Sequence, residues 1–334
     1  MIEYQEIRRV HLEISSLCNA SCPWCPRNFW GYPYNSGYPE ANLTLDQAKK
    51  IFQPAFLQQL DRIHINGNFG DIVMNPDGHK IVKYFFEHNP TLDVTISTNG
   101  SARNKQFWTA LGQTNVTVSF CIDGLEDTHH LYRQNTGWKT IIKNAKTFIQ
   151  AGGHAVWKFI KFKHNQHQID ECKKLSVELG FSSFDLIEST RVDAPVFDKH
   201  GKLSHILGDY RGETNFEILF YKKRTDLVLL EDIIPDRKEK KQISCGTKIN
   251  KEIYITSTGE VYPCCFTGFY PKTYGHGHYH QAANAQLKEF IKKNNALEYD
   301  LTECIKWFQS IQSSWNSKYF KEGRLVICDD NCGI

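Results

Sequence analysis

"LCNASCPWCPRN" (Leu17–Asn28) places Cys18, Cys22 and Cys25 in a C-x₃-C-x₂-C run directly after a β-prone segment. Structural zinc closes its shell with four protein ligands, so three thiols on one loop leave such a site incomplete. Three thiolates instead suit three irons of a [4Fe–4S] cube, whose fourth iron stays open to a small molecule. The alternative is a zinc site that borrows a distant fourth ligand.

The composition of the 334-residue chain, 40% hydrophobic and 23% charged, is typical of a soluble globular protein. Its net charge of +3 argues against nucleic acid or an anionic membrane as a partner. No apolar run approaches the ~20 residues that cross a bilayer, and the charged N-terminus is unlike a signal peptide. We therefore expect a cytoplasmic location, where thiols stay reduced and the eleven cysteines are first interpreted as metal ligands.

Short β-prone runs alternate with amphipathic helical patterns over the first two thirds of the chain. This alternation predicts a parallel sheet covered by helices. The expected strands are Val10–Ser15, Arg62–Gly67, Asp93–Thr98, Val116–Ile122, Ala155–Phe162 and Ser183–Ser189. The expected helices are Leu45–Leu57, Gly78–His88, Asn104–Leu111, Lys139–Ala151 and Gln168–Leu179.

The unusual residues follow the strand ends. They lie in the cysteine run, NGNFGD (66–71), STNGS (97–101), IDG (122–124), KHNQ (163–166) and STR (189–191). In a barrel every such loop opens at one mouth, whereas a doubly wound sheet uses two or three of them along a crevice. Six populated strand ends favour a partial (β/α)₆ TIM-like barrel.

The pattern C-x₃-C-x-aromatic-C after the first strand of such a barrel resembles the radical S-adenosylmethionine (radical SAM) superfamily. The resemblance covers roughly residues 8–192. It implies that Cys18, Cys22 and Cys25 hold a [4Fe–4S] cluster whose open iron chelates SAM. Reductive cleavage of SAM then yields a 5′-deoxyadenosyl radical that abstracts a substrate hydrogen. Trp24 holds the aromatic position that the family places near the adenine.

The resemblance also implies SAM contacts from later loops. Gly67–Asp71 matches a glycine-rich segment that contacts the methionine amino group, with Asp71 in place of the usual glutamate and Ile72 in place of a proline. Ser97–Gly100 resembles the loop that contacts ribose and carboxylate. Arg133 and Arg191 are candidates to pair with the SAM carboxylate, and a surface ion pair is the alternative for each. The expected SAM-binding residues are Trp24, Gly67, Gly70, Asp71, Ser97, Asn99, Asp123, Arg133 and Arg191.

A second unit carries six cysteines and a predicted hairpin around Ser257–Gly259. Its spacing Cys245-x₁₃-Gly259-x₄-Cys264 resembles the opening of the SPASM/Twitch extension of the same superfamily, over residues 244–332. The shorter Twitch form, with one auxiliary [4Fe–4S] cluster, fits better because a further cysteine run is absent. The implied ligands are Cys245, Cys264, Cys328 and Cys332; a zinc knuckle is the alternative. The expected domains are 1–192 (barrel), 193–243 (linker or insertion) and 244–334 (Twitch-like).

Four cysteines remain. Cys121 and Cys172 are interpreted as core residues. Cys265 and Cys304 are interpreted as packing residues, with the alternative that one of them, Cys304 above all, donates a hydrogen atom to a substrate radical. Two helices are expected near Ala282–Lys293 and Thr302–Ser317.

The resemblance predicts a radical SAM enzyme of oxidoreductase type that modifies a ribosomally made peptide. A dehydrogenase or epimerase acting on an aminocyclitol, sugar or other small molecule is the alternative, favoured by the absence of a leader-recognition domain before strand one. The expected electron donor is a flavodoxin or ferredoxin. A zinc-binding interaction protein and a nucleic-acid-modifying radical enzyme are further alternatives; the modest charge weighs against the latter.

Overall fold

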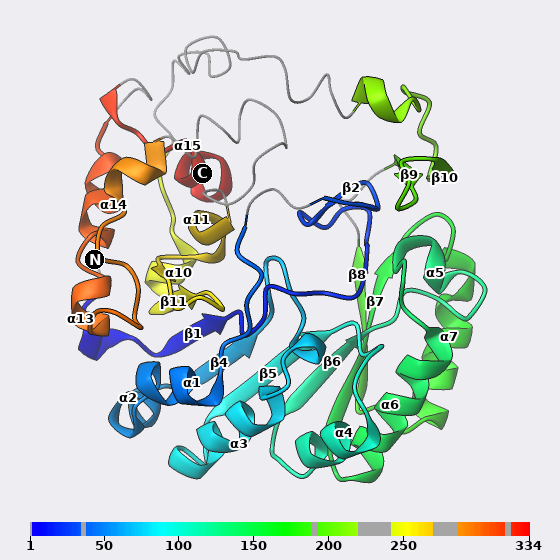
Figure 1. Cartoon of the computed structure of the whole chain (residues 1–334), viewed down its shortest axis with the longest axis horizontal. Helices are drawn as coiled ribbons and strands as arrows, with labels where there is room; N and C mark the ends of the chain where they lie inside the picture. Colours follow the sequence, from blue (N-terminus) through cyan, green and yellow to red (C-terminus); the bar gives the residue numbers. More distant parts are fainter. Residues whose placement is uncertain (1, 35–37, 189–192, 220–241, 270–285, 318–321) are drawn as a thin grey trace.

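An eight-stranded sheet organises the part of the chain described by this computed structural model, residues 2–34, 38–188, 193–219, 242–269, 286–317 and 322–334. Its order is β12-β11-β1-β4-β5-β6-β7-β8 (Figure 1). The strands are β1 (Arg9–Leu12), β4 (Arg62–Ile65), β5 (Asp93–Thr98), β6 (Thr117–Cys121), β7 (His154–Lys161), β8 (Ser183–Glu188), β11 (Glu252–Ile255) and β12 (Val261–Tyr262).

Strands β1 and β4 to β8 lie side by side in chain order, and each neighbouring pair is parallel. A doubly wound sheet reverses its strand order at a switch point, and this sheet does not. The predicted α/β class and partial-barrel arrangement are therefore confirmed. The largest differences from the predicted strand ends are at β1, which ends at Leu12, and at β4, which ends at Ile65, because the chain there turns into the loops described below.

Helices cover the outer face of these strands (Figure 1). The predicted helix Leu45–Leu57 is two helices, because Pro54 cannot continue the backbone hydrogen bonding of the first and opens the second instead. Thr44 caps the first: its hydroxyl accepts a hydrogen bond from the Gln47 amide at 3.2 Å. The helices are α1 (Leu45–Ile51), α2 (Pro54–Gln59), α3 (Gly78–His88), α4 (Lys105–Gly112), α5 (His129–Tyr132), α6 (Trp138–Gln150) and α7 (Ile169–Glu178), with 3₁₀ turns η1 (Tyr4–Glu6), η2 (Ile72–Met74) and η3 (Gln166–Gln168).

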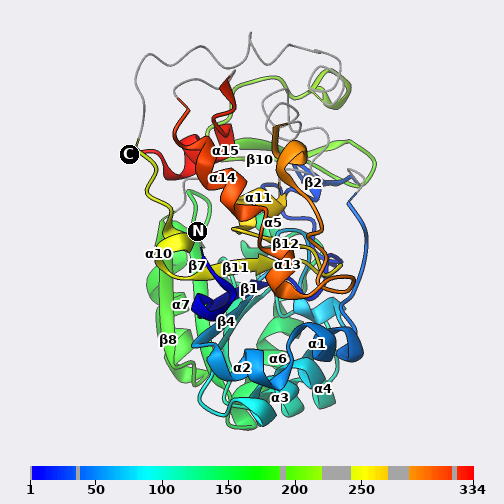
Figure 2. The same cartoon turned by 90° about the vertical axis from the view of Figure 1, so that its left-hand side faces the viewer.

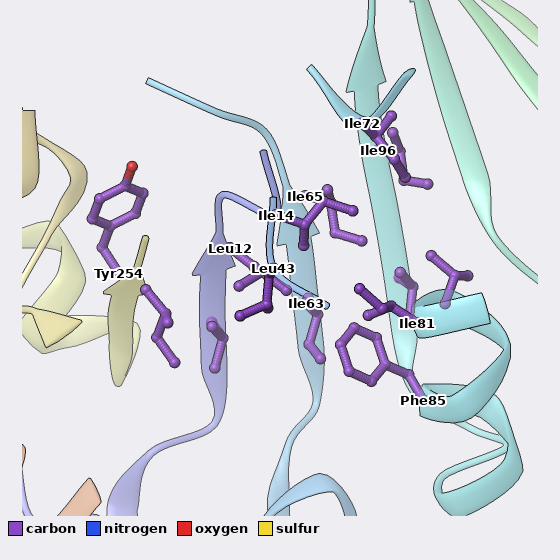
Figure 3. Close-up of a cluster of buried hydrophobic side chains, with 14 of the residues drawn as sticks. Leu12, Ile14, Leu43, Ile63, Ile65, Ile72, Ile81, Phe85, Ile96 and Tyr254 are labelled. Atoms are coloured by element: carbon purple, nitrogen blue, oxygen red, sulfur yellow. The ribbon is translucent and has the colours of Figure 1, made fainter. Parts of the chain in front are cut away.

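The core lies between these helices and the outward-facing residues of the strands. Leu12, Ile63 and Ile96 are buried there, in one hydrophobic cluster with Ile81 and Phe85 of α3 (Figure 3). Because side chains alternate along a strand, the residues between them point to the inner face. That inner face is polar and half-buried, and includes His11, His64, Thr95, Ser97, Ser119, Cys121 and Lys158.

The C-terminal part joins the same sheet. β11 pairs parallel with β1, and the predicted hairpin returns it to β12, with Tyr254 opposite Tyr262. Figure 2 shows the C-terminal helices beside β1 and β11. They are α10 (Gly246–Ile249), α11 (Cys265–Phe269), α13 (Leu301–Cys304), α14 (Phe308–Ser314) and α15 (Val326–Cys332). The division into domains 1–192, 193–243 and 244–334 stays a prediction. In the structure, β11 and β12 of the third segment join the sheet that the first segment forms.

Two predicted helices of this part differ in detail. Thr302–Ser317 is divided into α13 and α14. Of Ala282–Lys293, residues 286–290 are helical, 291–293 are not, and 282–285 lie outside the described residues. Two small hairpins complete the fold: β2 (Asn28–Phe29) with β3 (Tyr32–Pro33), and β9 (Ala194–Phe197) with β10 (Leu203–Leu207). Within the described residues no helix has the length and apolar character needed to span a membrane.

Candidate functional site

The loop after β1 gathers the three cysteines of the opening motif. Tight turns shape it: the amide of Cys25 donates to the carbonyl of Cys22 at 3.0 Å, and the amide of Asn28 donates to that of Cys25 at 2.9 Å. Cys22 is buried, and Cys18 and Cys25 are half-buried beside it. Burial, the charge of Asp71 and the other two thiols raise the pKa of Cys18 well above its usual value. Three thiolates this close repel one another, which a bound cationic cluster would relieve.

Asn99, which directly follows β5, contacts this loop. Its side-chain amide donates to Cys18 Sγ at 3.6 Å and to Asn19 Oδ1 at 3.1 Å. Ser97, two residues earlier, lies half-buried on the inner face of β5, next to Ser119 of β6. The predicted Ser97–Gly100 loop is therefore brought to the cysteines, while its contacts with SAM stay a prediction.

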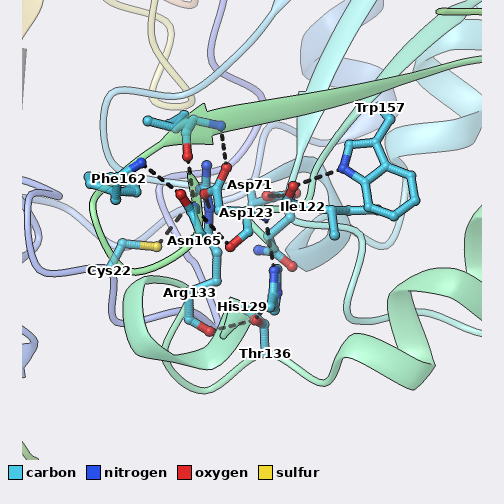
Figure 4. A network of polar contacts seen from close by, with 12 residues as sticks. Cys22, Asp71, Ile122, Asp123, His129, Arg133, Thr136, Trp157, Phe162 and Asn165 are labelled. Carbon is cyan, nitrogen blue, oxygen red and sulfur yellow. Dashed lines mark hydrogen bonds and ion pairs between the residues drawn. The ribbon is translucent and has the colours of Figure 1, made fainter. Parts of the chain in front are cut away.

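Asp123 and Arg133 form an ion pair beside the cysteine loop (Figure 4). Asp123 Oδ2 accepts from Arg133 Nε at 2.6 Å, and Oδ1 accepts from the Ile160 amide at 2.7 Å. Arg133 Nη1 lies 3.9 Å from Cys22 Sγ. Burial works against the charged guanidinium, but the pKa of Arg133 is raised because Asp123 and Cys22 outweigh that effect. A fixed positive charge thus stands next to one of the three thiols.

Asp71 uses its carboxylate within the chain. Its oxygens accept hydrogen bonds from Thr98 Oγ1 at 2.6 Å, from the Asn99 amide at 2.7 Å and from the Val73 amide at 3.1 Å. Its own amide donates to the carbonyl of Leu17 at 2.9 Å. Burial raises the pKa of Asp71. The residue therefore joins the glycine-rich loop, the loop after β5 and the start of the cysteine run; a direct contact with SAM stays a prediction.

The two glycines of the predicted SAM loop are required by packing within the protein. A Cβ atom on Gly70 would lie 1.8 Å from the carbonyl oxygen of Ser15. A Cβ atom on Gly67 would lie 2.5 Å from the carbonyl oxygen of Gly70. The loop can therefore lie against the end of β1 only because neither position carries a side chain.

The remaining predicted residues are placed as follows. Trp24 is half-buried, and its side chain packs against the same group of buried residues as Cys18 and Cys25, a group that includes Cys22. Arg191 lies outside the described residues. Cys304 is fully buried in the main core, where its thiol donates to the carbonyl of Tyr299 at 3.7 Å. Burial raises the pKa of Cys304 to about 12. This environment favours the packing interpretation of Cys304.

A second group of cysteines lines a cavity of about 380 Å³ in the C-terminal part. The cavity walls include Cys245, Cys264, Cys328 and Cys332, the four predicted auxiliary ligands, and also Cys265. A hydrogen bond with Cys332 lowers the pKa of Cys245 to about 5 and raises that of Cys332. Burial raises the pKa of Cys264 and Cys328 to about 12. The hydroxyls of Thr247 and Thr267 lie 3.3 Å and 3.5 Å from the sulfurs of Cys245 and Cys264.

The chemistry of this donor set fits an iron–sulfur cluster. Among the described residues, no three His, Cys, Asp or Glu side chains converge closely enough to hold one metal ion. The four thiolates of a cube each bind a different iron, so they stand further apart than the ligands of one ion. A cavity lined by thiols is the space that such a group requires.

Sequence reasoning missed several inner-face residues. Glu13 is buried at the end of β1, and its contacts are described below. His64 Nδ1 lies 2.8 Å from Thr95 Oγ1, and burial lowers the pKa of His64 to about 4. Cys121, interpreted as a core residue, instead faces the inner side between buried Phe120 and Ile122. Alternation along each strand could have identified all three as inward-facing.

Comparison with solved structures gives the fold. SuiB of Streptococcus suis bound to S-adenosylmethionine matches with a TM-score of 0.58 and 17% identity, over 92% of this chain and 68% of SuiB. SuiB bound to its precursor peptide SuiA matches with a TM-score of 0.54 and 16% identity, over 89% of this chain and 64% of SuiB. anSMEcpe with bound AdoMet matches with a TM-score of 0.54 and 15% identity, over 97% of this chain and 88% of anSMEcpe.

This chain therefore spans about two thirds of the length of SuiB. No protein-family model and no curated protein sequence matches it. SuiB and anSMEcpe are radical SAM enzymes. The chain has the radical SAM fold.

Proposed function

We propose that this protein is a radical SAM enzyme that binds a [4Fe–4S] cluster through Cys18, Cys22 and Cys25. The observation that carries the proposal is that these three thiols lie together on one loop of this fold, beside the Asp123–Arg133 pair. When bound, such a cluster supplies the electron that cleaves SAM to methionine and a 5′-deoxyadenosyl radical. That radical takes a hydrogen atom from the substrate, which gives 5′-deoxyadenosine and a substrate radical. Loss of one electron from the substrate radical would then oxidise the substrate, which is the basis for proposing an oxidoreductase-type reaction.

The chain's own residues hold and shield this site. Arg133 places positive charge beside Cys22, which stabilises the thiolate form that a cluster needs. Asn99 holds Cys18 in place through its side-chain amide. Tyr132, Val196 and Leu207 pack around the cysteines and limit the access of water.

SAM is proposed to lie along the inner face at the carboxyl ends of the strands. Because the carboxylates of Asp71 and Asp123 are engaged within the chain, we assign them to positioning the loops. The side chain of Ser97 and the backbone groups of Gly67–Gly70 other than the two amides that donate to Glu13 are the proposed ligand contacts. Asn99, whose side-chain amide is engaged with Cys18 and Asn19, stays a candidate contact from the resemblance. Trp24, Arg133 and Arg191 remain candidate contacts from the resemblance.

The experiment is anaerobic iron–sulfur reconstitution followed by incubation with SAM and dithionite. We expect the wild-type protein to form 5′-deoxyadenosine and Cys22→Ala to form none. Cys172→Ala is the control, because Cys172 is buried in α7 away from the cysteine loop; it should retain activity. An intact cluster without 5′-deoxyadenosine would contradict the proposal. Uptake of stoichiometric zinc with no iron–sulfur chromophore would support the zinc-binding alternative.

We further propose that Cys245, Cys264, Cys328 and Cys332 hold one auxiliary [4Fe–4S] cluster, as in a Twitch-like domain. The thiol-lined cavity of about 380 Å³ supports this assignment. With four protein ligands the cluster's shell is closed, so its role is to accept or relay an electron rather than bind substrate.

A peptide is the proposed substrate class. SuiB, which shares this fold, has been solved with its precursor peptide SuiA. The alternative is a small molecule such as an aminocyclitol or sugar, and the class that raises the yield of 5′-deoxyadenosine in the assay above separates the two. Because reductive cleavage consumes an electron, a flavodoxin or ferredoxin is proposed as the reducing partner.

A further inference from the structure

A buried glutamate connects the glycine-rich loop to the C-terminal part. Glu13, directly after β1, is only 1% exposed. Its Oε1 accepts hydrogen bonds from the amides of Phe69 at 2.7 Å and Gly70 at 3.0 Å. Its Oε2 accepts one from the hydroxyl of Tyr254, on β11, at 2.8 Å. One carboxylate therefore links residues that are 241 positions apart.

The glycine-rich loop is shaped to receive this carboxylate. A Cβ atom on Gly67 would lie 2.6 Å from Glu13 Oε1. A side chain at position 67 would thus push Glu13 away from the two amides that it accepts from. Hydrogen bonds to a charged carboxylate are about twice as strong as neutral ones, so this contact fixes the loop backbone more firmly than a water-exposed turn would.

Tyr254 is held as a donor. Burial and the adjacent charge of Glu13 raise the pKa of Tyr254 well above its usual value, so the hydroxyl keeps its proton. Its ring is fixed by His11, which is its partner in the β1–β11 register and lies 5.0 Å away between ring centroids. The hydroxyl therefore has one defined direction, toward Glu13.

Two further contacts join the same loop to α11. Asn68 Nδ2 donates to the carbonyl of Cys265 at 2.9 Å. The ring of Phe69 stacks on that of Phe269, with centroids 5.8 Å apart. Cys265 lines the cavity of the second cysteine group. The loop predicted to bind SAM is thus attached at three points to the part of the chain that carries the second cysteine group.

We propose that Glu13 and Tyr254 are positioning residues through which the C-terminal part holds the Gly67–Asp71 loop in its SAM-binding shape. The inference rests on the proposed function, because it assigns SAM to that loop. It gives the C-terminal part a role in SAM affinity that is separate from any electron transfer. Neither residue touches a reacting atom, so both act on binding rather than on the chemical step.

The test is Tyr254→Phe, which removes one hydroxyl and keeps the ring. We expect the dissociation constant of SAM for the reconstituted protein to rise about tenfold, the effect of losing one hydrogen bond to a charged group. At saturating SAM, 5′-deoxyadenosine formation should return to near the wild-type rate. Hydrogen exchange at the amides of Phe69 and Gly70 should become faster. Glu13→Gln combined with Tyr254→Phe should weaken SAM binding by less than the product of the single effects.

Tyr262→Phe is the matched control, because Tyr262 lies opposite Tyr254 on β12 and its hydroxyl donates to Glu260 at 3.3 Å. It should leave SAM affinity and loop exchange unchanged. If Tyr254→Phe lowers the melting temperature but changes neither the SAM affinity nor the hydrogen exchange of the loop, the link is only structural and the inference is wrong. If the wild-type protein binds no SAM, the proposed function fails instead, and the exchange comparison without SAM still tests the link.

Discussion

The Asp123–Arg133 pair is shielded from water on both sides: their side chains are 0% and 13% exposed. Buried ion pairs matter most when one partner is removed, since the other is then left charged and desolvated. Sequence reasoning assigned both residues to SAM separately. The structure instead pairs them with each other, and only Arg133 also reaches a cysteine.

Replacing Asp123 by asparagine should therefore lower the free energy of unfolding by about 3 kcal/mol, because Arg133 stays buried without its counter-charge. Asp209→Asn is the control. Its partner Lys163 lies 2.6 Å away, but both side chains are 62% exposed, so solvent screens the pair and the change should be much smaller than that of Asp123→Asn. Urea denaturation of the two variants at neutral pH checks this. Equal changes in the free energy of unfolding would contradict a larger contribution of the buried Asp123–Arg133 pair to stability.

At the scale of elements, α5 and the turn after it are locked to the end of β6 by His129. The amide of Asp123 donates to His129 Nδ1 at 3.1 Å, so the ring proton is on Nε2 and points to Thr136 Oγ1 at 3.0 Å (Figure 4). Burial, followed by the charges of Arg133 and His130, lowers the pKa of His129 to about 3. The folded protein thus requires neutral His129.

This requirement predicts a pH dependence of stability. Between pH values of about 3 and 6.5, His129 is protonated in the unfolded chain but neutral in the folded protein. The free energy of unfolding therefore falls as the pH drops below about 6.5. The loss from pH 7 to pH 5 should be about 2 kcal/mol. Urea denaturation at both pH values measures it. His129→Gln should remove this part of the loss, and the exposed His130→Gln should not; identical pH slopes in both variants would contradict the assignment.

At the scale of the whole molecule, β11 continues the sheet next to β1, and Glu13 bonds across that junction. The two cysteine groups therefore lie in one continuous framework, although Cys25 and Cys245 are 220 positions apart in the sequence. A single rigid sheet is what allows a contact in the C-terminal part to shape a loop near the first group.

The two proposed four-iron sites predict a bound iron content of about eight per chain after reconstitution. Cys18→Ala/Cys22→Ala and Cys245→Ala/Cys332→Ala should each retain about four, because each double variant loses one site. Iron analysis with Mössbauer spectroscopy measures this. Unchanged iron in the second variant would remove the auxiliary cluster from the proposal while leaving the first site intact.

Local signals were sufficient for much of the fold. Alternation predicted all six parallel strands, and Asp93–Thr98 and Gly78–His88 match the observed bounds. The division of the predicted helix Leu45–Leu57 at Pro54 could also have been predicted, since proline is not accommodated in the interior of a regular helix. These features depend on neighbours within a few residues, which is the information that periodicity and turn residues carry.

The sequence by itself determined the cysteine loop, the alternation of strands and helices along the chain and the hairpin near Gly259, because each is a short-range pattern. The tertiary structure alone decided what the polar residues contact. Asp71 joins three loops, and Cys304 lies in the core. Glu13 accepts a hydrogen bond from Tyr254. Such pairings depend on the register between strands and on which loops share a strand end. No spacing along the chain encodes those, since they are set by the packing of the whole sheet.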